Sequence, residues 1–384
     1  MKTTPRFREF DQRATAGEPL NVVFFGASLT WGANASDPQL TSYRARVGQR
    51  LQEAYPKAPF RFWDAAIGGT GSQLGVFRLD RDVLSRKPDL VFLDFSANDN
   101  IHTDDEETLA SYESLIRRIL TETNAPIVQV VLPFKQDAEA GDTSTMLRRT
   151  AHHAISHVYR TGFGDAITLM QKRIKQGQTT ADALWPYDGG HPCDAGYELF
   201  AEAAWAGFRE GIEKDLQTHI PTEPLYGDTY LTNARVRLST LGPLPEGWRM
   251  DHPNLTAAFF DMLMSRWLDD EVVATGPTPF KIRFRGTMAL LFGESTPQSA
   301  RFRVILDEEE TEHDAGWLGV PARGNGHLSF ILGQDLDPDR EHTLEIVPLI
   351  EPGSDGELRL ESLCVAGKKA AVFRAESQNE AGCA

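Results

Sequence analysis

The sequence is poor in cysteine and in long apolar runs, and each shortage excludes a class of protein. Three cysteines among 384 residues, Cys193, Cys364 and Cys383, are too few and too scattered for a disulfide framework. No apolar run approaches the roughly 20 residues that span a bilayer. The N-terminal segment MKTTPRFREFDQR lacks the apolar core of a secretory signal. We therefore expect a reduced, cytoplasmic protein.

Positive charge is also in short supply. The 39 basic residues are outnumbered by 55 acidic ones, which gives a formal net charge of -16. Nucleic-acid-binding proteins need a basic surface to neutralise phosphates, and anionic membranes attract basic segments in the same way. We therefore expect neither nucleic acid nor a membrane as a partner, and the sequence makes no prediction of an oligomeric state.

Up to about residue 220, short apolar strands alternate with helical patterns. Strands that alternate with helices imply parallel pairing and helices on both faces of the sheet. Residues 1–220 are therefore predicted to form a three-layer α/β/α sandwich. The helix over 102–120 is expected to begin with Thr103 as N-cap and Glu106 three residues later, a capping box. The expected strands are 21–25, 61–67, 89–95, 125–133 and 164–168, and further helices are expected at 41–55 and 74–85.

From residue 221 to 384 the pattern changes to short strands separated by Gly, Pro and Asp, which is typical of a β-sandwich. Strands are expected at 281–286, 301–307, 327–332, 342–350 and 357–365. The acidic stretch 307–314 lacks the spacing of a calcium loop and is expected to be an exposed hairpin. Residues 255–268 fit either a short helix or an irregular crossing, and the tail from about 375 is expected to be frayed.

Residues that could take part in catalysis follow the first three strands. GASLT (26–30) carries Ser28, IGGTG (67–71) carries Gly69, and SANDN (96–100) carries Asn98. Because the C-terminal ends of parallel strands share one edge of the sheet, these three stretches are expected to converge. A fourth stretch, DGGHP (188–192), precedes the last helix of this half and can deliver its carboxylate and imidazole to the same edge.

Acyl transfer needs a nucleophile, a base, a group that orients the base, and donors for the oxyanion. Ser28 is the candidate nucleophile and His191 the candidate base, with Asp188 holding the imidazole in the required tautomer. The backbone N–H groups of Ser28 and Gly69, together with the side-chain amide of Asn98, are the candidate oxyanion hole. Neither a metal nor another cofactor is expected.

In this order the four blocks resemble those of the SGNH (GDSL) hydrolase family, over roughly residues 18–215. The resemblance implies a flavodoxin-like fold and membership among esterases, lipases, thioesterases and carbohydrate deacetylases. It also implies the same roles for Ser28, Gly69, Asn98, Asp188 and His191. Two positions depart from the family pattern, because Ala27 replaces the usual Asp and Ser96 the usual Gly. Neither of them carries the chemistry.

Each candidate has an ordinary alternative when it is taken alone. Ser28 fits an N-cap, Asn98 with its following Asp fits a turn, and His191 fits the start of a helix. Together, these alternatives would have to account for four blocks that occur in the family order, so the catalytic interpretation is favoured. His153 and His157, four residues apart, lack a third metal ligand at diagnostic spacing, so a packing or surface role is favoured.

The blocks therefore predict a serine esterase that removes short acyl groups, above all acetyl from a saccharide, through an acyl-enzyme on Ser28. Trp31, Trp185 and Tyr187 flank the site, and they are either flat walls for a sugar or aryl group or packing residues. Residues 228–375 resemble the jelly-roll modules attached to some carbohydrate esterases. Trp248, Trp267 and Trp317 in this half are either a sugar platform or core.

Three other functions remain open at this point. The same site would serve an aryl or lipid esterase, which chain-length preference separates from a carbohydrate esterase. It would also serve an acyltransferase, in which an added sugar alcohol diverts the acyl group from water. A glycan-binding protein with an inactive hydrolase half is the alternative of another class, and the complete set of site residues argues against it.

Overall fold

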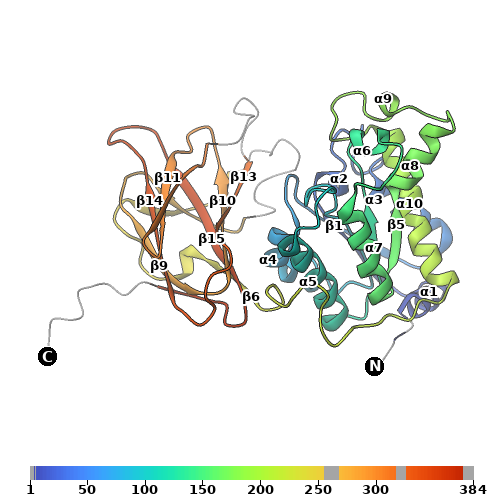
Figure 1. Ribbon diagram of the computed structural model, residues 1–384, viewed down its shortest axis with the longest axis horizontal. Coiled ribbons are helices and arrows are strands. Elements are labelled where there is room, and N and C mark those ends of the chain that lie inside the picture. The colour runs from blue at the N-terminus through green and yellow to red at the C-terminus, as the bar shows by residue number, and fades with distance from the viewer. Residues whose placement is uncertain (1–3, 5, 255–267, 317–325, 375–384) are drawn as a thin grey trace. The chain divides into compact units, whose positions relative to one another are not determined.

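The computed structural model of the chain describes residues 4, 6–254, 268–316 and 326–374 (Figure 1). The contacts within it divide the chain into two compact units, Met1–Gly227 and Asp228–Ala384. Outside the described residues lie the tail from residue 375 and the undecided segment 255–268 as far as residue 267. The same is true of Trp267, Trp317 and Cys383.

The first unit is built on a parallel sheet in which the strands follow the order β2-β1-β3-β4-β5. This is a doubly wound order: from β1 the chain adds β2 on one side and then β3, β4 and β5 on the other. The switch lies between β1 and β3, and open α/β sheets bind ligands at such a point. The predicted flavodoxin-like α/β fold is confirmed. The strands are β1 (Leu20–Gly26), β2 (Phe60–Ala66), β3 (Leu90–Leu93), β4 (Ile127–Val131) and β5 (Gly162–Asp165).

Helices cover both faces of this sheet (Figure 1). Alternate residues of β1 point to opposite faces: Phe24 stacks on Phe92 in the core that α3 and α10 cover, whereas Phe25 packs edge-on against Phe95. The helices are α1 (Arg6–Ala16), α2 (Ser28–Trp31), α3 (Tyr43–Ala54), α4 (Ser72–Asp82), η1 (Leu84–Arg86), α5 (Glu106–Glu122), α6 (Lys135–Glu139), α7 (Leu147–Tyr159), α8 (Ala166–Lys175), α9 (Ala181–Leu184) and α10 (Asp194–Glu213). In the described part of the chain, none of the helices has the length and apolarity to cross a membrane.

The start of α5 differs from the prediction. Asp105, not Thr103, is the N-cap, and its side chain accepts a hydrogen bond of 2.9 Å from the N–H of Thr108. The Thr103 hydroxyl instead donates to the carbonyl of Asn100 in the preceding turn. The capping box predicted from Thr103 and Glu106 is therefore wrong, because the hydroxyl is engaged before the helix begins.

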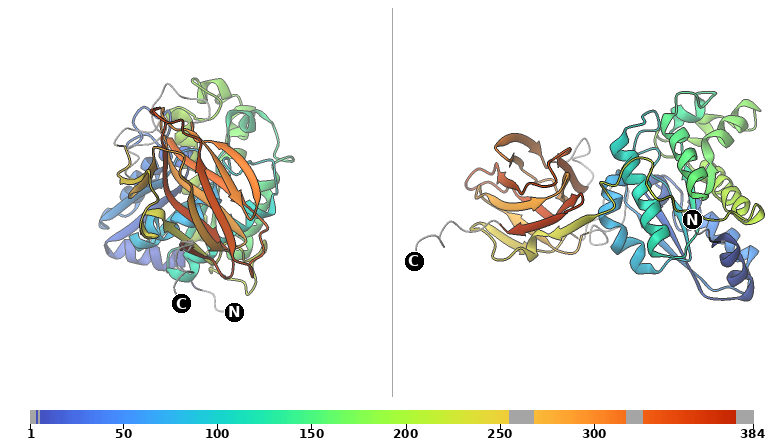
Figure 2. Two further views of the ribbon diagram at one scale, coloured as in Figure 1. Left: turned by 90° about the vertical axis from the view of Figure 1, so that its left-hand side faces the viewer. Right: turned by 60° about the horizontal axis from the view of Figure 1, so that its bottom comes forward.

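The second unit, coloured yellow to red in Figure 2, consists of two antiparallel sheets. One sheet has the order β13-β10-β15-β8-β7 with β6 beside β15, and the other has the order β12-β11-β14-β9-β16. Leu291 and Leu360 of the first sheet share one core with Ile282 and Leu344 of the second. The predicted all-β sandwich is confirmed. The elements are β6 (Asn233–Arg237), η2 (Leu238–Thr240), β7 (Trp248–Asp251), β8 (Glu271–Ala274), β9 (Phe280–Arg285), β10 (Met288–Ser295), β11 (Arg301–Leu306), β12 (Glu309–Asp314), β13 (Gly326–Gly333), β14 (His342–Pro348), β15 (Leu358–Ala366) and β16 (Ala371–Arg374).

Two of the expectations for this unit concern side chains on the described strands. Trp248 is a core residue, since it packs edge-on against Phe280 at 5.1 Å between ring centroids and is 7% exposed. It therefore offers no flat surface to a sugar. The acidic stretch forms the β11–β12 hairpin, and the side chains of β12 are mostly exposed, as expected.

Candidate active site

Three of the four sequence blocks lie at neighbouring strand ends. β1 lies between β2 and β3, with Gly26 opposite Ala66 and Phe25 opposite Leu93. The pairing continues one step further, because the N–H of Ile67 bonds the carbonyl of Gly26. Ser28, Gly69 and Asn98 lie two, three and five residues after these strand ends, and α2 and α6 lie at the same end of the sheet (Figure 1).

Ser28 and His191 are in hydrogen-bond contact. Ser28 Oγ lies 2.9 Å from His191 Nε2, although the two residues are 163 positions apart in the chain. Ser28 is the first residue of α2, whose N-cap is Ala27, and the serine is 5% exposed. The alternative of Ser28 as an N-cap is therefore wrong. His191 lies before α10, which begins at Asp194, so it does not start that helix either.

Asp188 lies on the other side of the imidazole. Its Oδ2 is 3.4 Å from His191 Nδ1, and its Oδ1 accepts bonds of 2.7 Å from the N–H groups of Gly190 and His191. The side chain of Asn34 donates to the same Oδ2 over 2.8 Å. The structure thus brings the candidate nucleophile, the candidate base and the carboxylate together in the order that acyl transfer requires. Hydrogen bonds of this kind are often long without substrate and tighten when it binds.

The protonation states suit a neutral base. Burial lowers the pKa of His191, and the charge of Asp188 offsets only part of that effect. Burial by itself would raise the pKa of Asp188, but the His191 N–H, the Asn34 amide and the Gly190 N–H hold that pKa below its usual value. At neutral pH the carboxylate is therefore charged and the imidazole is free to take a proton from Ser28.

The candidate oxyanion donors are available for a ligand. In the described part of the chain, the N–H groups of Ser28 and Gly69 and the side-chain amide of Asn98 make no hydrogen bond with the protein. Gly69 has a φ of +72°, in the left-handed region that favours glycine. This conformation turns the IGGTG loop sharply after β2 and leaves Gly69 exposed.

A buried carboxylate ties two of the loops that carry these donors. Asp99 Oδ1 accepts a bond of 2.9 Å from the N–H of Ser72, at the start of α4. A Cβ at position 71 would collide with the same oxygen, so Gly71 permits the close approach. Burial raises the pKa of Asp99 to about 6. Asp99 thus connects the loop of Asn98 to the loop of Gly69, a role that the sequence did not reveal.

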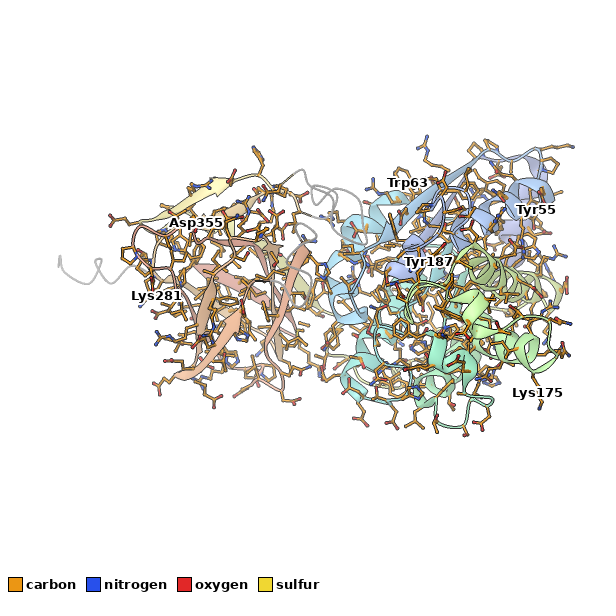
Figure 3. The ribbon with its side chains drawn as sticks, turned by 90° about the horizontal axis from the view of Figure 1, so that it is seen from above. Tyr55, Trp63, Lys175, Tyr187, Lys281 and Asp355 are labelled. Carbon is orange, nitrogen blue, oxygen red and sulfur yellow. The ribbon has the colours of Figure 1, made fainter. Side chains whose placement is uncertain are left out.

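The three flanking aromatic residues have different surroundings. Trp185 is 3% exposed and packs edge-on against Phe200 in the core, so its ring presents almost no surface to a substrate. Trp31, at the end of α2, is half-buried. Tyr187 is 74% exposed on the loop between α9 and α10 (Figure 3). Of the three, Tyr187 has the free surface that a sugar-binding aromatic residue needs.

A pocket of about 400 Å³ lies against the loop that carries the base. Its floor includes Gly189 and Gly190, directly before His191, and the carbonyl of Gly189 accepts a bond of 2.9 Å from the N–H of Lys135. The remaining lining comes from α6 and its N-cap residue, namely Phe134, Lys135, Gln136 and Glu139. An aromatic ring beside amide and charged groups is a mixture that suits a polyhydroxylated ligand.

The other candidates from the sequence lie elsewhere. His153 packs edge-on against Phe163 at 5.1 Å, and among the described residues no group of three or more His, Cys, Asp or Glu is arranged to hold a metal ion. Cys193 is the N-cap residue of α10, and its thiol donates to the carbonyl of Ala183.

Comparison with known proteins agrees with the geometry. Residues 24–199 match the model of the GDSL-like lipase/acylhydrolase family. The chain has no significant match among the curated proteins. Among solved structures it is similar to a two-domain esterase (CEX) active on acetylated mannans, in a form co-crystallised with mannopentaose. The identity is 22%, the TM-score 0.75, and the match covers 97% of this chain and 96% of that one.

A second crystal structure of that esterase gives 23% identity, a TM-score of 0.75 and coverage of 95% and 96%. Axe2, an acetylxylan esterase from Geobacillus stearothermophilus, matches 49% of this chain and 94% of its own, with 23% identity and a TM-score of 0.39. The family match over residues 24–199 confirms the predicted resemblance to the SGNH (GDSL) hydrolases for the part of the chain that it covers, and it supports an ester hydrolase.

Proposed function

We propose that the protein is a serine esterase that removes acetyl and other short acyl groups from a saccharide, since residues 24–199 match the GDSL-like lipase/acylhydrolase family. The observation that carries the chemistry is the contact of 2.9 Å between Ser28 Oγ and His191 Nε2, with Asp188 behind the imidazole. A serine hydroxyl next to a neutral imidazole, which a carboxylate orients, is the arrangement of an activated nucleophile.

In the proposed reaction Ser28 Oγ attacks the acyl carbon while His191 Nε2 takes the hydroxyl proton. The negative charge that develops on the carbonyl oxygen is bound by the N–H groups of Ser28 and Gly69 and by the amide of Asn98. His191 then returns the proton to the departing alcohol, leaving an acyl group on Ser28. A water molecule, deprotonated by the same imidazole, releases the acid and restores the free enzyme. The charge of Asp188 stabilises the imidazolium in both steps.

The substrate class rests on two further observations. The two-domain esterase that shares the fold over 97% of this chain acts on acetylated mannans. The pocket beside His191 offers the half-buried ring of Phe134 and the exposed side chains of Gln136 and Glu139 to the alcohol part of a substrate. A saccharide can stack on the ring and hydrogen-bond to the amide and carboxylate.

The experiment measures acetate release from a panel of acetylated oligosaccharides and p-nitrophenol release from acyl esters of rising chain length, beside the Ser28→Ala variant. We expect turnover of acetyl esters, a sharp decline with chain length, and no turnover by a folded Ser28→Ala protein. A variant that retains near-parental rates would refute the site. Preference for long acyl chains would instead indicate a lipid esterase, and acyl transfer to an added sugar alcohol would indicate an acyltransferase.

A further inference from the structure

We propose that Asn34 is a positioning residue of the active site, whose side-chain amide fixes the carboxylate of Asp188 against His191. The inference rests on the proposed function. Asn34 lies in the loop between α2 and α3, and its Nδ2 is 2.8 Å from Asp188 Oδ2 and 3.4 Å from the carbonyl oxygen of His191. One amide group therefore contacts both the carboxylate and the backbone of the base.

Asp188 needs an external partner to fix its outer oxygen. The N–H groups of Gly190 and His191 hold Oδ1, whereas Oδ2 is the atom that faces the imidazole Nδ1. The contact from Asn34 to Oδ2 is shorter than that from His191, 2.8 against 3.4 Å. The Asp188 side chain is 46% exposed, so water would compete for an oxygen that no protein group fixed. The amide of Asn34 thus orients Oδ2 so that one lone pair of this oxygen stays directed at the imidazole.

The segment that carries Asn34 is itself anchored to α10, the helix that follows His191. The hydroxyl of the buried Tyr197 donates to the carbonyl of Ala33 over 2.6 Å. On the other side, Asp194 accepts from the N–H and the hydroxyl of Ser36, over 2.8 and 2.5 Å. The chain on both sides of Asn34 is therefore fixed to α10, the helix that follows His191. Asn34 has a φ of 66°, a left-handed conformation that Asn tolerates better than most residues.

Two substitutions at this position separate the amide from the loop. Asn34→Gly removes the amide while keeping the left-handed backbone accessible, and Asn34→Asp keeps the shape but places a second carboxylate against Asp188. Ser36→Ala is the matched control, because it removes the hydroxyl bond to Asp194, whereas the backbone N–H of Ser36 still holds the loop to the same carboxylate and the Asn34 amide is unchanged. Each variant of the full chain is assayed with p-nitrophenyl acetate, and its melting temperature is measured.

Loss of a hydrogen bond to the charged group that orients the base is expected to lower the rate about tenfold. We expect kcat to fall about tenfold in Asn34→Gly and further in Asn34→Asp, with KM unchanged, whereas Ser36→Ala keeps the parental kcat. Full kcat in Asn34→Gly would overturn the inference, and so would an equal loss in Ser36→Ala. If wild type hydrolyses the ester and Ser28→Ala does not, such a result refutes only the role of Asn34. If wild type is inactive, the proposed function itself fails.

Discussion

Replacing Gly26 by alanine tests whether the end of β1 positions the nucleophile. Gly26 is the last residue of the strand, two positions before Ser28, and it packs against the end of β3. A Cβ at this position would lie 2.5 Å from the carbonyl oxygen of Asp94 and would also collide with the side chain of Thr30 in α2. Neither neighbour is the free end of a flexible side chain, because one is backbone and Thr30 is completely buried.

The required displacement follows from these contacts. A Cβ does not approach another heavy atom within 3.0 Å, so the ends of β1 and β3 must separate by at least 0.5 Å, the difference between 3.0 and 2.5 Å. The movement is transmitted directly to Ser28, whose hydroxyl is within 2.9 Å of His191. A misplacement of roughly 1 Å at a reacting group costs about 100-fold in rate. Overpacking of this kind also costs about 1–3 kcal/mol of folding free energy.

We therefore expect Gly26→Ala to lower kcat/KM for p-nitrophenyl acetate by roughly 10- to 100-fold and to lower the melting temperature by several degrees. The matched control is Gly276→Ala in the second unit, where a Cβ meets no atom within 4 Å and the backbone is not left-handed. Circular dichroism confirms that each variant is folded before its kinetics are measured. A Gly26→Ala protein with parental kcat/KM and melting temperature would show that β1 tolerates the displacement without moving Ser28.

Three further predictions concern ionisable groups. Because burial lowers the pKa of His191, the acidic limb of the kcat/KM–pH profile should have its midpoint below 6.5, and a midpoint above that value would refute a neutral buried base. Arg78 is fully buried and donates hydrogen bonds to the carbonyl of Gly26 and to Asp82. Arg78→Met should therefore lower the free energy of unfolding, measured with denaturant, by about 3–5 kcal/mol, because it leaves the Asp82 carboxylate without this partner. A decrease below about 1 kcal/mol would contradict this. Burial raises the pKa of Glu271 to about 8 in the folded state. The folded form then binds the extra proton, so the second unit should lose stability as pH rises from about 4.5 to 8, and Glu271→Gln should flatten this dependence in thermal melts.

Much of the fold could be predicted because the strands are apolar runs that end at recognisable breaks. The run NVVFF lies within β1, and the strand order brings the blocks that follow β1, β2 and β3 to one edge of the sheet. The spacing within DGGHP was sufficient to place Asp188 and His191 on one loop. Helix starts were harder to predict, since Thr103 and Asp105 are both good caps, and the hydroxyl of Thr103 is used in the preceding turn.

Side-chain direction was not predictable from proximity in sequence. Trp185 and Tyr187 both precede Asp188 by a few residues, yet one ring is 3% and the other 74% exposed. The difference arises from α10, because Phe200 and Tyr197 of that helix form the core into which Trp185 packs. The loop sequence WPYDGGHP contains no periodicity that would distinguish the two aromatic residues.

The contacts that hold the site together are the hardest to predict, because they join residues far apart in the chain. Asn34 and Asp188 are separated by 154 positions, and Ser72 and Asp99 by 27, so no local spacing relates them. Their residue types are also those of ordinary turns. A catalytic block can be found in a sequence because its chemistry restricts the residue to serine, histidine or aspartate. The residue that orients it needs only one donor at the correct distance, and many side chains supply that. Residues such as Asn34 therefore become visible only when the fold gives the distance, and their contribution must be measured by kcat rather than inferred from the motif.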